Sequence, residues 1–387
     1  MFERRLEATL RRHSAHFAVL AVTGPRQSGK TTLVRSVFAQ KPYVSLEDPA
    51  ERAFAQEDPR GFLARFANGA VFDEAQRWPA LFSYLQGLVD QDRTPGRFVL
   101  TGSQQFGLLS GITQSLAGRV GMSTLLPLGF AEIPAVQSAT QSLDAILLRG
   151  AYPQLHATAV PTGDWLASYV STYVERDVRQ VLNVQDLSTF TRFLRLCAGR
   201  TGQLLNFAAL ADEAGVSQST ARAWMAVLEA SYILHLLPPY FRNFGKRLVK
   251  TPKLYFVDTG LAAWLLGIQT PEQLATHPAR GALFETWVVS EALKCRLHAG
   301  QPSNLFFWRD NNGVEADLMF ETPQGLQTVE IKSGQTVTPD SIRAGLRSKR
   351  MVAGEEALTP WLVHGGADTY ERSGVRVVGW REAGALF

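Results

Sequence analysis

The sequence has few cysteines and no long apolar run. Its two cysteines, Cys197 and Cys295, lie far apart among 387 residues and lack the close spacing of metal ligands. This scarcity excludes a disulfide-rich scaffold and is typical of a reducing compartment. No segment reaches the roughly 18 consecutive apolar residues of a membrane span, and no signal-peptide-like run follows the basic N-terminus. We therefore expect a cytoplasmic, soluble protein without a membrane partner.

Net charge is small. The chain has 39 Lys and Arg against 35 Asp and Glu, which gives a formal net charge of +4, and 45% of its residues are apolar. These values are typical of a globular chain and exclude intrinsic disorder. The length predicts two or three domains. A mild basic excess allows a nucleic-acid partner without requiring one. The distribution of charge along the chain must therefore show whether a basic surface for nucleic acid exists.

Strand-like and helix-like stretches alternate through the first third of the chain. The strand candidates are residues 16–22, 43–48, 69–74, 97–103 and 123–128, with helix-like segments such as 79–90 between them. Such alternation predicts a parallel α/β sheet with helices on its faces. After about residue 130 the pattern becomes helical, and from residue 275 onward it predicts an α+β domain.

A glycine-rich loop joins the first predicted strand to the helix that follows it. The loop has the pattern G-x-x-x-x-G-K-T and consists of Gly24, Pro25, Arg26, Gln27, Ser28, Gly29, Lys30 and Thr31, followed by Thr32. Glycines let the backbone amides face phosphate oxygens, Lys30 brings a charge to the terminal phosphates, and Thr31 offers a hydroxyl to Mg²⁺. The loop therefore predicts a binding site for ATP and Mg²⁺.

The strand at 69–74 ends in two acids. We expect Asp73 to reach Mg²⁺ through water and Glu74 to polarise the water that attacks the phosphate. An ordinary acidic pair at a helix N-terminus is the alternative for these two residues taken alone. With the glycine loop upstream, hydrolysis of ATP is the favoured interpretation, with Lys30 and Glu74 as catalytic residues.

Two further residues are candidates for the same reaction. Ser103, at the end of the strand 97–103, could orient the attacking water as a sensor residue, or it could cap the next helix. Arg119 could be an arginine finger that reaches the nucleotide of a neighbouring subunit, or it could be a surface arginine. Both alternatives remain open for each residue.

Four segments together resemble a known family. They are GPRQSGKTTL (24–33), FDEAQ (72–76), LTGSQ (100–104) and SLAGR (115–119). They are similar to segments of the bacterial and archaeal AAA+-type ATPases that carry a C-terminal DUF4143 domain. The segments YVERDV (173–178) and YFVDTGLAAWLLG (255–267) resemble that second domain. The resemblance covers nearly the whole chain and implies Mg-ATP hydrolysis, a helical lid and a winged helix. We also expect a homo-oligomer, with a hexamer as one candidate.

The middle of the chain has the form of a helix-turn-helix. Residues 204–237 contain two helical stretches around the turn Ala-Gly-Val-Ser at 214–217. The strand-like pair that follows contains five basic residues, namely Arg242, Lys246, Arg247, Lys250 and Lys253. Such a wing could follow the phosphates of DNA. Because the second helix offers few side chains that read base edges, we expect backbone contacts with weak sequence specificity. The alternative is a winged helix that packs against protein.

The C-terminal segment has an acid on one strand and E-x-K on the next. Asp317 and Glu330 could hold Mg²⁺ while Lys332 orients water, and Glu285 could complete the site from a helix. This is the pattern of the PD-(D/E)xK nuclease fold. A hairpin with exposed charges, or a nuclease-like fold that no longer cuts, is the alternative.

The sequence predicts four segments. They are a P-loop AAA+ ATPase core at 1–130, a helical lid at 131–185, a winged-helix domain at 186–268 and a restriction-endonuclease-like domain at 275–387. The predicted function is ATP hydrolysis that drives binding, remodelling or translocation of DNA, with a C-terminal domain that binds or cleaves DNA. The alternative is a nucleotide-gated switch or scaffold whose C-terminal half binds protein.

Overall fold

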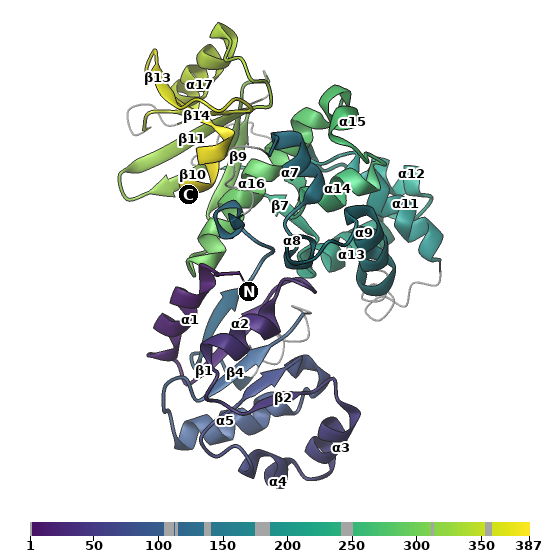
Figure 1. Cartoon of the computed structure of the whole chain (residues 1–387), viewed down its shortest axis with the longest axis vertical. Helices are drawn as coiled ribbons and strands as arrows, with labels where there is room; N and C mark the ends of the chain where they lie inside the picture. The colour runs from purple at the N-terminus through teal and green to yellow at the C-terminus, as the bar shows by residue number, and fades with distance from the viewer. Residues whose placement is uncertain are drawn as a thin grey trace. The chain divides into compact units, whose positions relative to one another are not determined.

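The structure is a computed structural model (Figure 1) that describes residues 2–103, 112, 115–134, 141–174, 186–240, 251–310, 313–352 and 358–387. The chain forms two compact units. The first unit consists of Met1–Leu128, Ala230–Tyr232 and Arg296–Pro302, and the second of Gly129–Glu229, Ile233–Cys295 and Ser303–Phe387. Among the helices that the structure describes, none is long and apolar enough to cross a membrane.

The first unit contains a five-stranded parallel sheet with the strand order β2-β3-β4-β1-β5. The strands are β1 (Val19–Thr23), β2 (Tyr43–Ser45), β3 (Val71–Asp73), β4 (Phe98–Thr101) and β5 (Val120–Thr124). The helices of this unit include α1 (Leu6–Ser14), α2 (Lys30–Val37), α3 (Pro49–Glu57), α4 (Pro59–Ala64) and α5 (Leu81–Gln91). Every residue of β1 and β4 is buried, as expected for parallel strands that are covered on both faces. The predicted parallel α/β class is confirmed, although β5 begins three residues earlier than the predicted strand 123–128.

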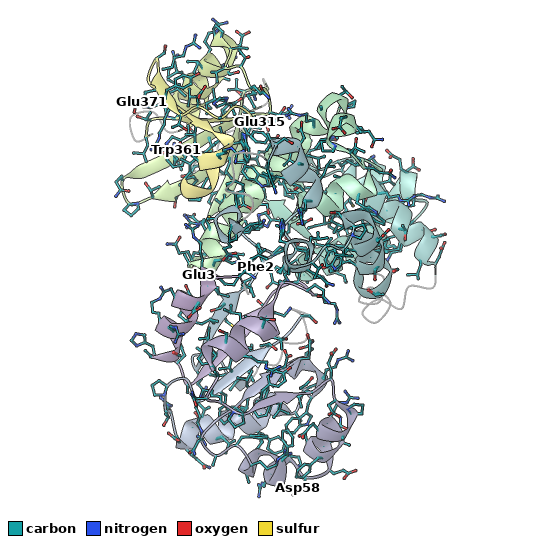
Figure 2. All side chains as sticks on the ribbon, viewed as in Figure 1. Phe2, Glu3, Asp58, Glu315, Trp361 and Glu371 are labelled. Atoms are coloured by element: carbon teal, nitrogen blue, oxygen red, sulfur yellow. The ribbon has the colours of Figure 1, made fainter. Side chains whose placement is uncertain are left out.

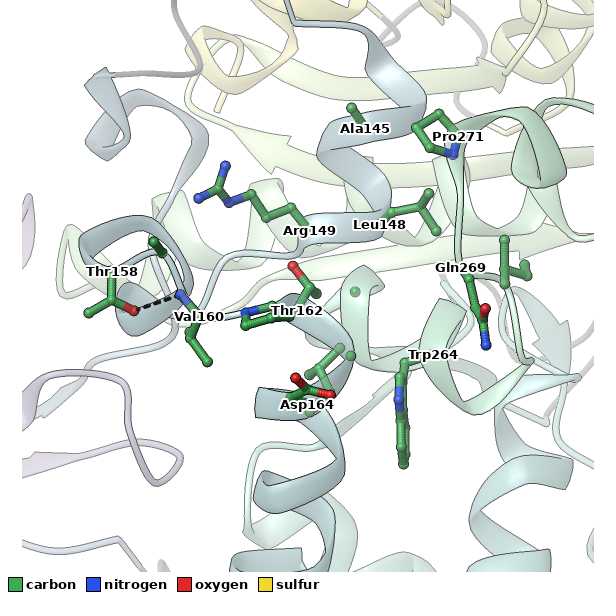
Figure 3. Close-up of a pocket in the computed structure, with 16 residues that line it drawn as sticks. Ala145, Leu148, Arg149, Thr158, Val160, Thr162, Asp164, Trp264, Gln269 and Pro271 are labelled. Atoms are coloured by element: carbon green, nitrogen blue, oxygen red, sulfur yellow. Dashed lines mark hydrogen bonds between the residues drawn. The ribbon is translucent and has the colours of Figure 1, made fainter.

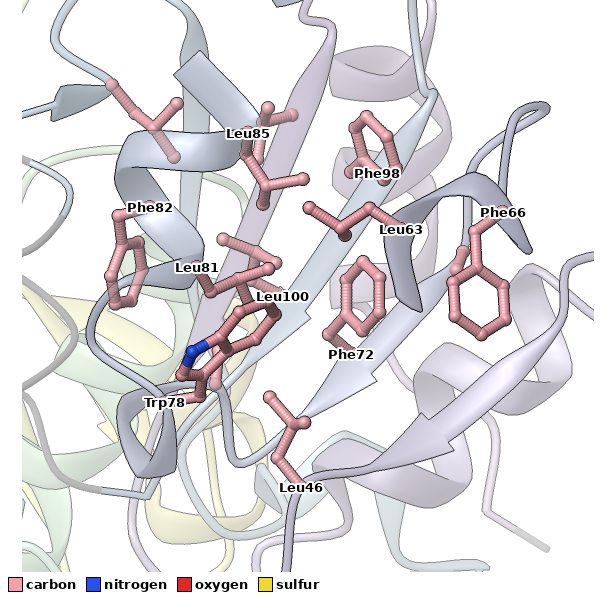
Figure 4. Packing of buried hydrophobic residues seen from close by; sticks show 14 of the residues in the cluster. Leu46, Leu63, Phe66, Phe72, Trp78, Leu81, Phe82, Leu85, Phe98 and Leu100 are labelled. Atoms are coloured by element: carbon pink, nitrogen blue, oxygen red, sulfur yellow. The ribbon is translucent and has the colours of Figure 1, made fainter. Parts of the chain in front are cut away.

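Aromatic side chains fill one side of this sheet (Figure 4). The Phe62 ring meets the Phe66 and Trp78 rings edge to face, each at a centroid distance of 5.5 Å. Phe72 of β3 stacks on Phe98 of β4 at 6.2 Å. Truncating a buried phenylalanine such as Phe62 to alanine typically costs about 3–5 kcal/mol. This packing holds β3 and β4 in place. It therefore also fixes the positions of the polar residues at the carboxyl ends of these strands.

The second unit begins with short helices from the segment predicted as a lid. These are α7 (Leu143–Arg149), α8 (Pro153–Ala157) and α9 (Thr162–Tyr169), which continues into a π-helical turn at Val170–Val174. Helix α7 packs against α14 (Thr259–Leu265). Asp258 caps α14 by accepting a hydrogen bond from the amide of Leu261 at 2.9 Å, and its other carboxylate oxygen accepts one from the amide of Ala151 at 2.7 Å. The described part of the predicted lid is thus built into the second unit.

A three-helix block with a small antiparallel sheet follows in the chain. Its elements are α11 (Leu187–Ala198), β6 (Gln203–Leu204), α12 (Phe207–Ala214), α13 (Gln218–Ala230), β7 (Leu234–Leu237) and β8 (Lys253–Phe256), with the strand order β6-β8-β7. Gly215 has a φ of 76° at the end of α12, where the left-handed backbone ends the helix. Ala221, Trp224, Met225 and Leu228 of α13 are buried, so its apolar face packs inward.

The last part of the second unit is a six-stranded mixed sheet with the order β13-β14-β12-β11-β10-β9. Its elements are α15 (Pro271–Thr276), α16 (Arg280–His298), β9 (Leu305–Arg309), β10 (Glu315–Thr322), β11 (Gly325–Lys332), α17 (Pro339–Val352), β12 (Trp361–His364), β13 (Tyr370–Arg372) and β14 (Val375–Gly379). Strands β10 and β11 form an antiparallel hairpin around Pro323 and Gln324. The hairpin places Asp317 and Glu330 on neighbouring strands.

Candidate nucleotide site and C-terminal carboxylate cluster

The glycine loop lies between the carboxyl end of β1 and the first turn of α2. Gly24 has a φ of +144°, and a Cβ there would lie 2.0 Å from the carbonyl oxygen of Leu125. Gly29 is left-handed, with a φ of 94°, immediately before α2. Only glycine fits both positions without strain. The two glycines therefore allow the compact path by which the loop joins β1 to α2.

Two side chains of the loop suit a phosphate. Lys30 Nζ donates hydrogen bonds to the carbonyl oxygens of Gly24, at 3.0 Å, and Pro25, at 2.8 Å, so its ammonium lies within the loop. Ser28 is completely buried, and its hydroxyl has no hydrogen-bond partner in the part of the chain that the structure describes. Buried polar groups without partners are rare, and an anion in the loop would supply one. These residues fit the phosphates of a nucleotide.

Asp73 collects hydroxyl groups from three elements. Its Oδ2 accepts hydrogen bonds from the hydroxyls of Thr31 at 2.8 Å and Tyr43 at 2.6 Å. Its Oδ1 accepts a hydrogen bond from Thr101. Burial and this carboxylate raise the pKa of Tyr43 above its usual range. The predicted pair of Thr31 and Asp73 therefore meets at the edge of the loop, where hard oxygen ligands suit Mg²⁺.

Glu74 is held in a strained backbone conformation next to this pair. Its φ of 54° and ψ of 47° are left-handed, which costs a non-glycine residue about 1–3 kcal/mol. Ser103 donates a hydrogen bond to Glu74 Oε2 at 2.9 Å, and Gln76 donates to the same oxygen. The structure thus brings the predicted residues Glu74 and Ser103 together. Sequence reading missed Gln76, which is two positions away, and Tyr43, which only the pairing of β2 with β3 brings close.

A buried arginine supports the backbone of the glycine loop. Arg4 is only 6% exposed, and its guanidinium donates hydrogen bonds of 2.7 Å to the carbonyl oxygens of Ser28 and Leu126. Sequence reading missed this residue because its only local signal is a run of basic residues at the N-terminus. Arg4 fixes the loop backbone relative to the segment after β5.

Two short segments from later in the chain belong to the first unit. Tyr232 shares a hydrogen bond of 2.8 Å with Thr23, the last residue of β1 before the glycine loop. The amide of Leu126 donates a hydrogen bond to His298 Nε2 at 3.1 Å. The edge of the sheet next to the loop is thus completed by residues that lie far away in the sequence.

Arg119 lies immediately before β5, at the amino end of the parallel strands and opposite the glycine loop. Its guanidinium forms a bidentate pair with Asp90 of α5, with Nε–Oδ1 and Nη2–Oδ2 distances of 2.7 Å and 3.0 Å. The hydrogen bond from Arg119 is the main cause of the lowered pKa of Asp90. Because β1 and β5 are parallel and Val19 pairs with Val120, Arg119 cannot face the nucleotide of its own subunit.

The predicted acids of the C-terminal fold meet a lysine. Asp317 and Glu330 are buried, and Lys332 Nζ lies 2.6 Å from Glu330 Oε1 and 3.8 Å from Asp317 Oδ2. Asp317 Oδ2 also accepts a hydrogen bond from the amide of Ile331 at 2.8 Å. Burial and the charge of Asp317 raise the pKa of Glu330 to about 8, against the opposing effect of Lys332.

Glu285 of α16 contacts strand β8. Its Oε1 accepts hydrogen bonds from Lys253 Nζ at 2.9 Å and from the hydroxyl of Tyr255 at 2.5 Å. Lys253 also pairs with Glu315, which is labelled in Figure 2. Burial raises the pKa of Glu285, while Lys253 lowers it. Among the described residues, no group of three or more His, Cys, Asp or Glu side chains is arranged to hold a metal ion.

Comparison with known proteins places these sites in a family. Residues 16–134 match an AAA domain, residues 140–272 a domain of unknown function (DUF8612) and residues 280–382 a domain of unknown function (DUF4143). Protein Rv2008c of Mycobacterium tuberculosis is 36% identical over 354 residues, which cover 90% of this chain and 77% of that protein. Protein Mb2031c of Mycobacterium bovis matches with the same values. The chain belongs to the AAA-type P-loop ATPases with a C-terminal DUF4143 domain.

Two solved structures are similar to this ATPase. The Walker-type ATPase PABY2304 of Pyrococcus abyssi is 13% identical, with a TM-score of 0.47, over 68% of this chain and 96% of that chain. The T158V form of RuvB from Thermotoga maritima is 20% identical, with a TM-score of 0.30, over 60% of this chain and 86% of that chain.

The structure corrects one of the five predicted DNA contacts of this ATPase. Lys253 is 3% exposed and paired with two glutamates, so it cannot follow a DNA backbone. The prediction for Lys253 was wrong because the residue lies in β8, where it faces α16. The other four predicted contacts, Arg242, Lys246, Arg247 and Lys250, lie outside the described residues.

A separate cavity of about 640 Å³ lies in the second unit of the ATPase, between α7, the start of α9 and α14 (Figure 3). Its lining includes Leu148, Asp164 and Trp264. Arg149 also lines it, but its guanidinium donates hydrogen bonds of 2.6 Å and 3.1 Å to the carbonyl oxygen of Leu155. None of the residues predicted for a site from the sequence lies in this cavity.

Proposed function

We propose that this ATPase couples hydrolysis of Mg-ATP to the binding and remodelling of DNA. The observation that carries the proposal is the element order α11-β6-α12-α13-β7-β8, which matches the order that we expect for a winged helix. The connection between β7 and β8 contains four basic residues, Arg242, Lys246, Arg247 and Lys250. Basic residues that follow a helix-turn-helix in the sequence suit contacts with the phosphate backbone of DNA.

In the nucleotide site, the loop amides and Lys30 would hold the phosphates, and Thr31 and Asp73 would hold Mg²⁺. The metal ion supplies charge neutralisation at the phosphates when it is bound. Glu74 is the residue that would orient water and attract its proton. Its carboxylate is fixed by Ser103 and Gln76, and this fixed orientation is what a water-positioning residue requires. Hydrolysis would then release contacts at the loop.

The DNA contacts would be to the backbone more than to base edges. Arg222, the one arginine on α13, has its guanidinium 4.2 Å from the centre of the Phe207 ring and is thus packed on α12. At the start of α13, the hydroxyl of Ser217 shares hydrogen bonds of 2.8 Å with Ser219 and Thr220. Few side chains remain that could read bases, which favours binding with weak sequence specificity.

The C-terminal fold would contribute a second DNA-binding surface. The order α16-β9-β10-β11-α17-β12, with β11 and β12 parallel, supports this proposal because it matches the order that we expect for a PD-(D/E)xK fold. We also propose assembly of several copies, with a hexamer as one candidate, because Arg119 could serve only the nucleotide of a neighbouring subunit.

A nucleotide-gated switch that binds protein is the second candidate. The scarcity of base-reading side chains on α13 favours it, because such a winged helix can equally pack against protein. ATP turnover measured with and without duplex DNA, over a range of salt concentrations, separates the two. Stimulation of ATP turnover by DNA that declines steeply with rising salt concentration supports the DNA role. ATP turnover that is the same with and without DNA at low salt supports the switch.

A further inference from the structure

A buried lysine lies among the carboxylates where a nuclease-like fold would place a divalent cation. Lys253, on β8, has only 4% of its side chain exposed. Its ammonium contacts Glu285 of α16 and Glu315 of β10, and the charge of Asp317 also acts on it. A lysine is almost never buried this deeply unless carboxylates pair with it.

Several carboxylate oxygens of the cluster have donors from the protein, whereas Glu330 Oε2 is buried without a hydrogen-bond partner among the described residues. Glu285 Oε1 accepts hydrogen bonds from both Lys253 and Tyr255, and Asp317 Oδ2 accepts one from the amide of Ile331. Mg²⁺ takes about six oxygen ligands near 2.1 Å, of which one or two are usually carboxylates and several are waters. Ammonium groups already lie at these acids, because Lys253 contacts Glu285 and Glu315 while Lys332 Nζ lies 2.6 Å from Glu330 and 3.8 Å from Asp317. With these ammonium groups in place, the residues do not fit the metal that the fold implies.

Cations of the protein offset much of the negative charge of the cluster. Lys253 and Lys332 are two of them, and Arg309 lies 3.3 Å from Glu315 Oε2 as a third. These three positive groups face four carboxyl groups, those of Glu285, Glu315, Asp317 and Glu330. A divalent ion placed beside a buried ammonium would be repelled by it, and the repulsion is strong because the two charges would be close together in a medium of low dielectric constant.

We propose that the ammonium of Lys253 takes the place of the catalytic cation, so that this domain binds no divalent metal and does not cleave DNA. Lys253 belongs to the sheet beside the helix-turn-helix, whereas Glu285 and Glu315 belong to the C-terminal fold. The two ion pairs therefore fasten these parts of the second unit together. This inference does not depend on ATP hydrolysis, because none of its residues lies in the nucleotide site.

The test is binding of Mn²⁺ to the full chain without nucleotide, followed by electron paramagnetic resonance of the free ion. Wild type and Asp317→Asn are expected to take up the same amount, because Asp317 is not a ligand. Lys253→Met is expected to take up one more equivalent, which the double variant Lys253→Met/Asp317→Asn loses. Uptake by wild type that Asp317→Asn abolishes overturns the proposal, and so does a folded Lys253→Met protein with no added uptake.

Thermal unfolding keeps the proposal testable if Lys253→Met folds poorly. The loss of Lys253 alone leaves buried carboxylates without their cation, whereas Lys253→Met/Glu285→Gln removes one charge of each sign. We expect the double variant to melt at a higher temperature than Lys253→Met, because it buries one fewer uncompensated charge. If the double variant is no more stable, Lys253 does not act as the balancing cation and the proposal fails.

Discussion

The hydroxyl of Thr31 donates a 2.8 Å hydrogen bond to Asp73, and this bond joins the first turn of α2 to the end of β3. The two residues that would hold Mg²⁺ are therefore in direct contact. Tyr43 and Thr101 donate to the same carboxylate and keep its orientation. Hydrogen bonds that fix the polar groups of a site reduce the rearrangement that catalysis requires.

Substitutions at Lys30 and Glu74 should separate nucleotide binding from hydrolysis. Lys30→Ala should abolish tight nucleotide binding, because the loop loses its cation. Glu74→Gln should bind ATP but hydrolyse it about 10²–10⁴-fold more slowly, the usual range for a lost acid–base group. Binding of a fluorescent ATP analogue and steady-state phosphate release measure the two effects. Wild-type turnover by Glu74→Gln would exclude Glu74 as the residue that polarises water.

Arg4→Met should weaken nucleotide binding although Arg4 supports the loop backbone and is not expected to contact the nucleotide. The two carbonyl oxygens that Arg4 holds would lose charge-assisted hydrogen bonds, each worth about 1.5–3 kcal/mol. We expect a lower melting temperature of the first unit and a larger Kd for ATP. Arg5→Met is the matched control because the neighbouring Arg5 is exposed. Equal ATP affinity of the two variants would show that Arg4 does not support the nucleotide-binding loop.

Arg119 and Asp90 should respond differently if Arg119 acts on a neighbouring subunit. Arg119→Ala should bind ATP normally and hydrolyse it poorly, whereas Asp90→Ala should leave hydrolysis intact because the guanidinium becomes free. Mixing Arg119→Ala with Glu74→Gln should restore part of the turnover through mixed interfaces. A protein that stays monomeric with ATP and still hydrolyses it would contradict this role.

The raised pKa of Glu330 predicts a pH-dependent stability. In the folded chain this pKa is about 8, against 4.5 for an ordinary glutamate. The folded state therefore binds more protons than the unfolded state between these values, and the free energy of unfolding should fall as the pH rises from about 4.5 to 8. Glu330→Gln should flatten that slope, which urea unfolding at pH 5 and pH 8 measures. An unchanged slope would show that Glu330 titrates normally.

Reversing the charges of Lys246, Arg247 and Lys250 should weaken DNA binding for all sequences. If these residues contact phosphates, the dependence of log Kd on log salt should also become shallower, by about 0.9 for each lost contact. Arg93→Glu is a control on an exposed arginine of the first unit. Unchanged affinity of the triple variant would favour a wing that binds protein.

The sequence predicts the nucleotide site well because its signals are local. Gly24, Gly29, Lys30 and Thr31 form one continuous loop, and Asp73 ends a strand whose apolar residues reveal it. The partners that orient these residues come from elsewhere in the fold. Arg4 reaches Ser28 only because α1 packs beside the loop, and no spacing in the sequence encodes that contact.

Lys253 shows why the C-terminal cluster could not be predicted in the same way. The residue stands at the end of a basic stretch, and the sequence groups it with Lys250 as part of a wing. In the structure it lies on the same face of β8 as Tyr255, two residues on, and both contact Glu285. The alternation of side-chain direction along this short strand was the sequence signal that could have placed Lys253 and Tyr255 on one face. The position of α16, which supplies Glu285, is a long-range feature of the fold.

The most direct test of the central claim is ATP turnover by the full chain with and without duplex DNA, with Glu74→Gln as the inactive control. The account predicts that DNA increases turnover several-fold at low salt, and that the increase is largely lost between about 50 and 200 mM salt. It also predicts that Glu74→Gln turns over ATP about 10²–10⁴-fold more slowly than wild type under either condition. Turnover by wild type that is the same with and without DNA at low salt would contradict the proposed coupling.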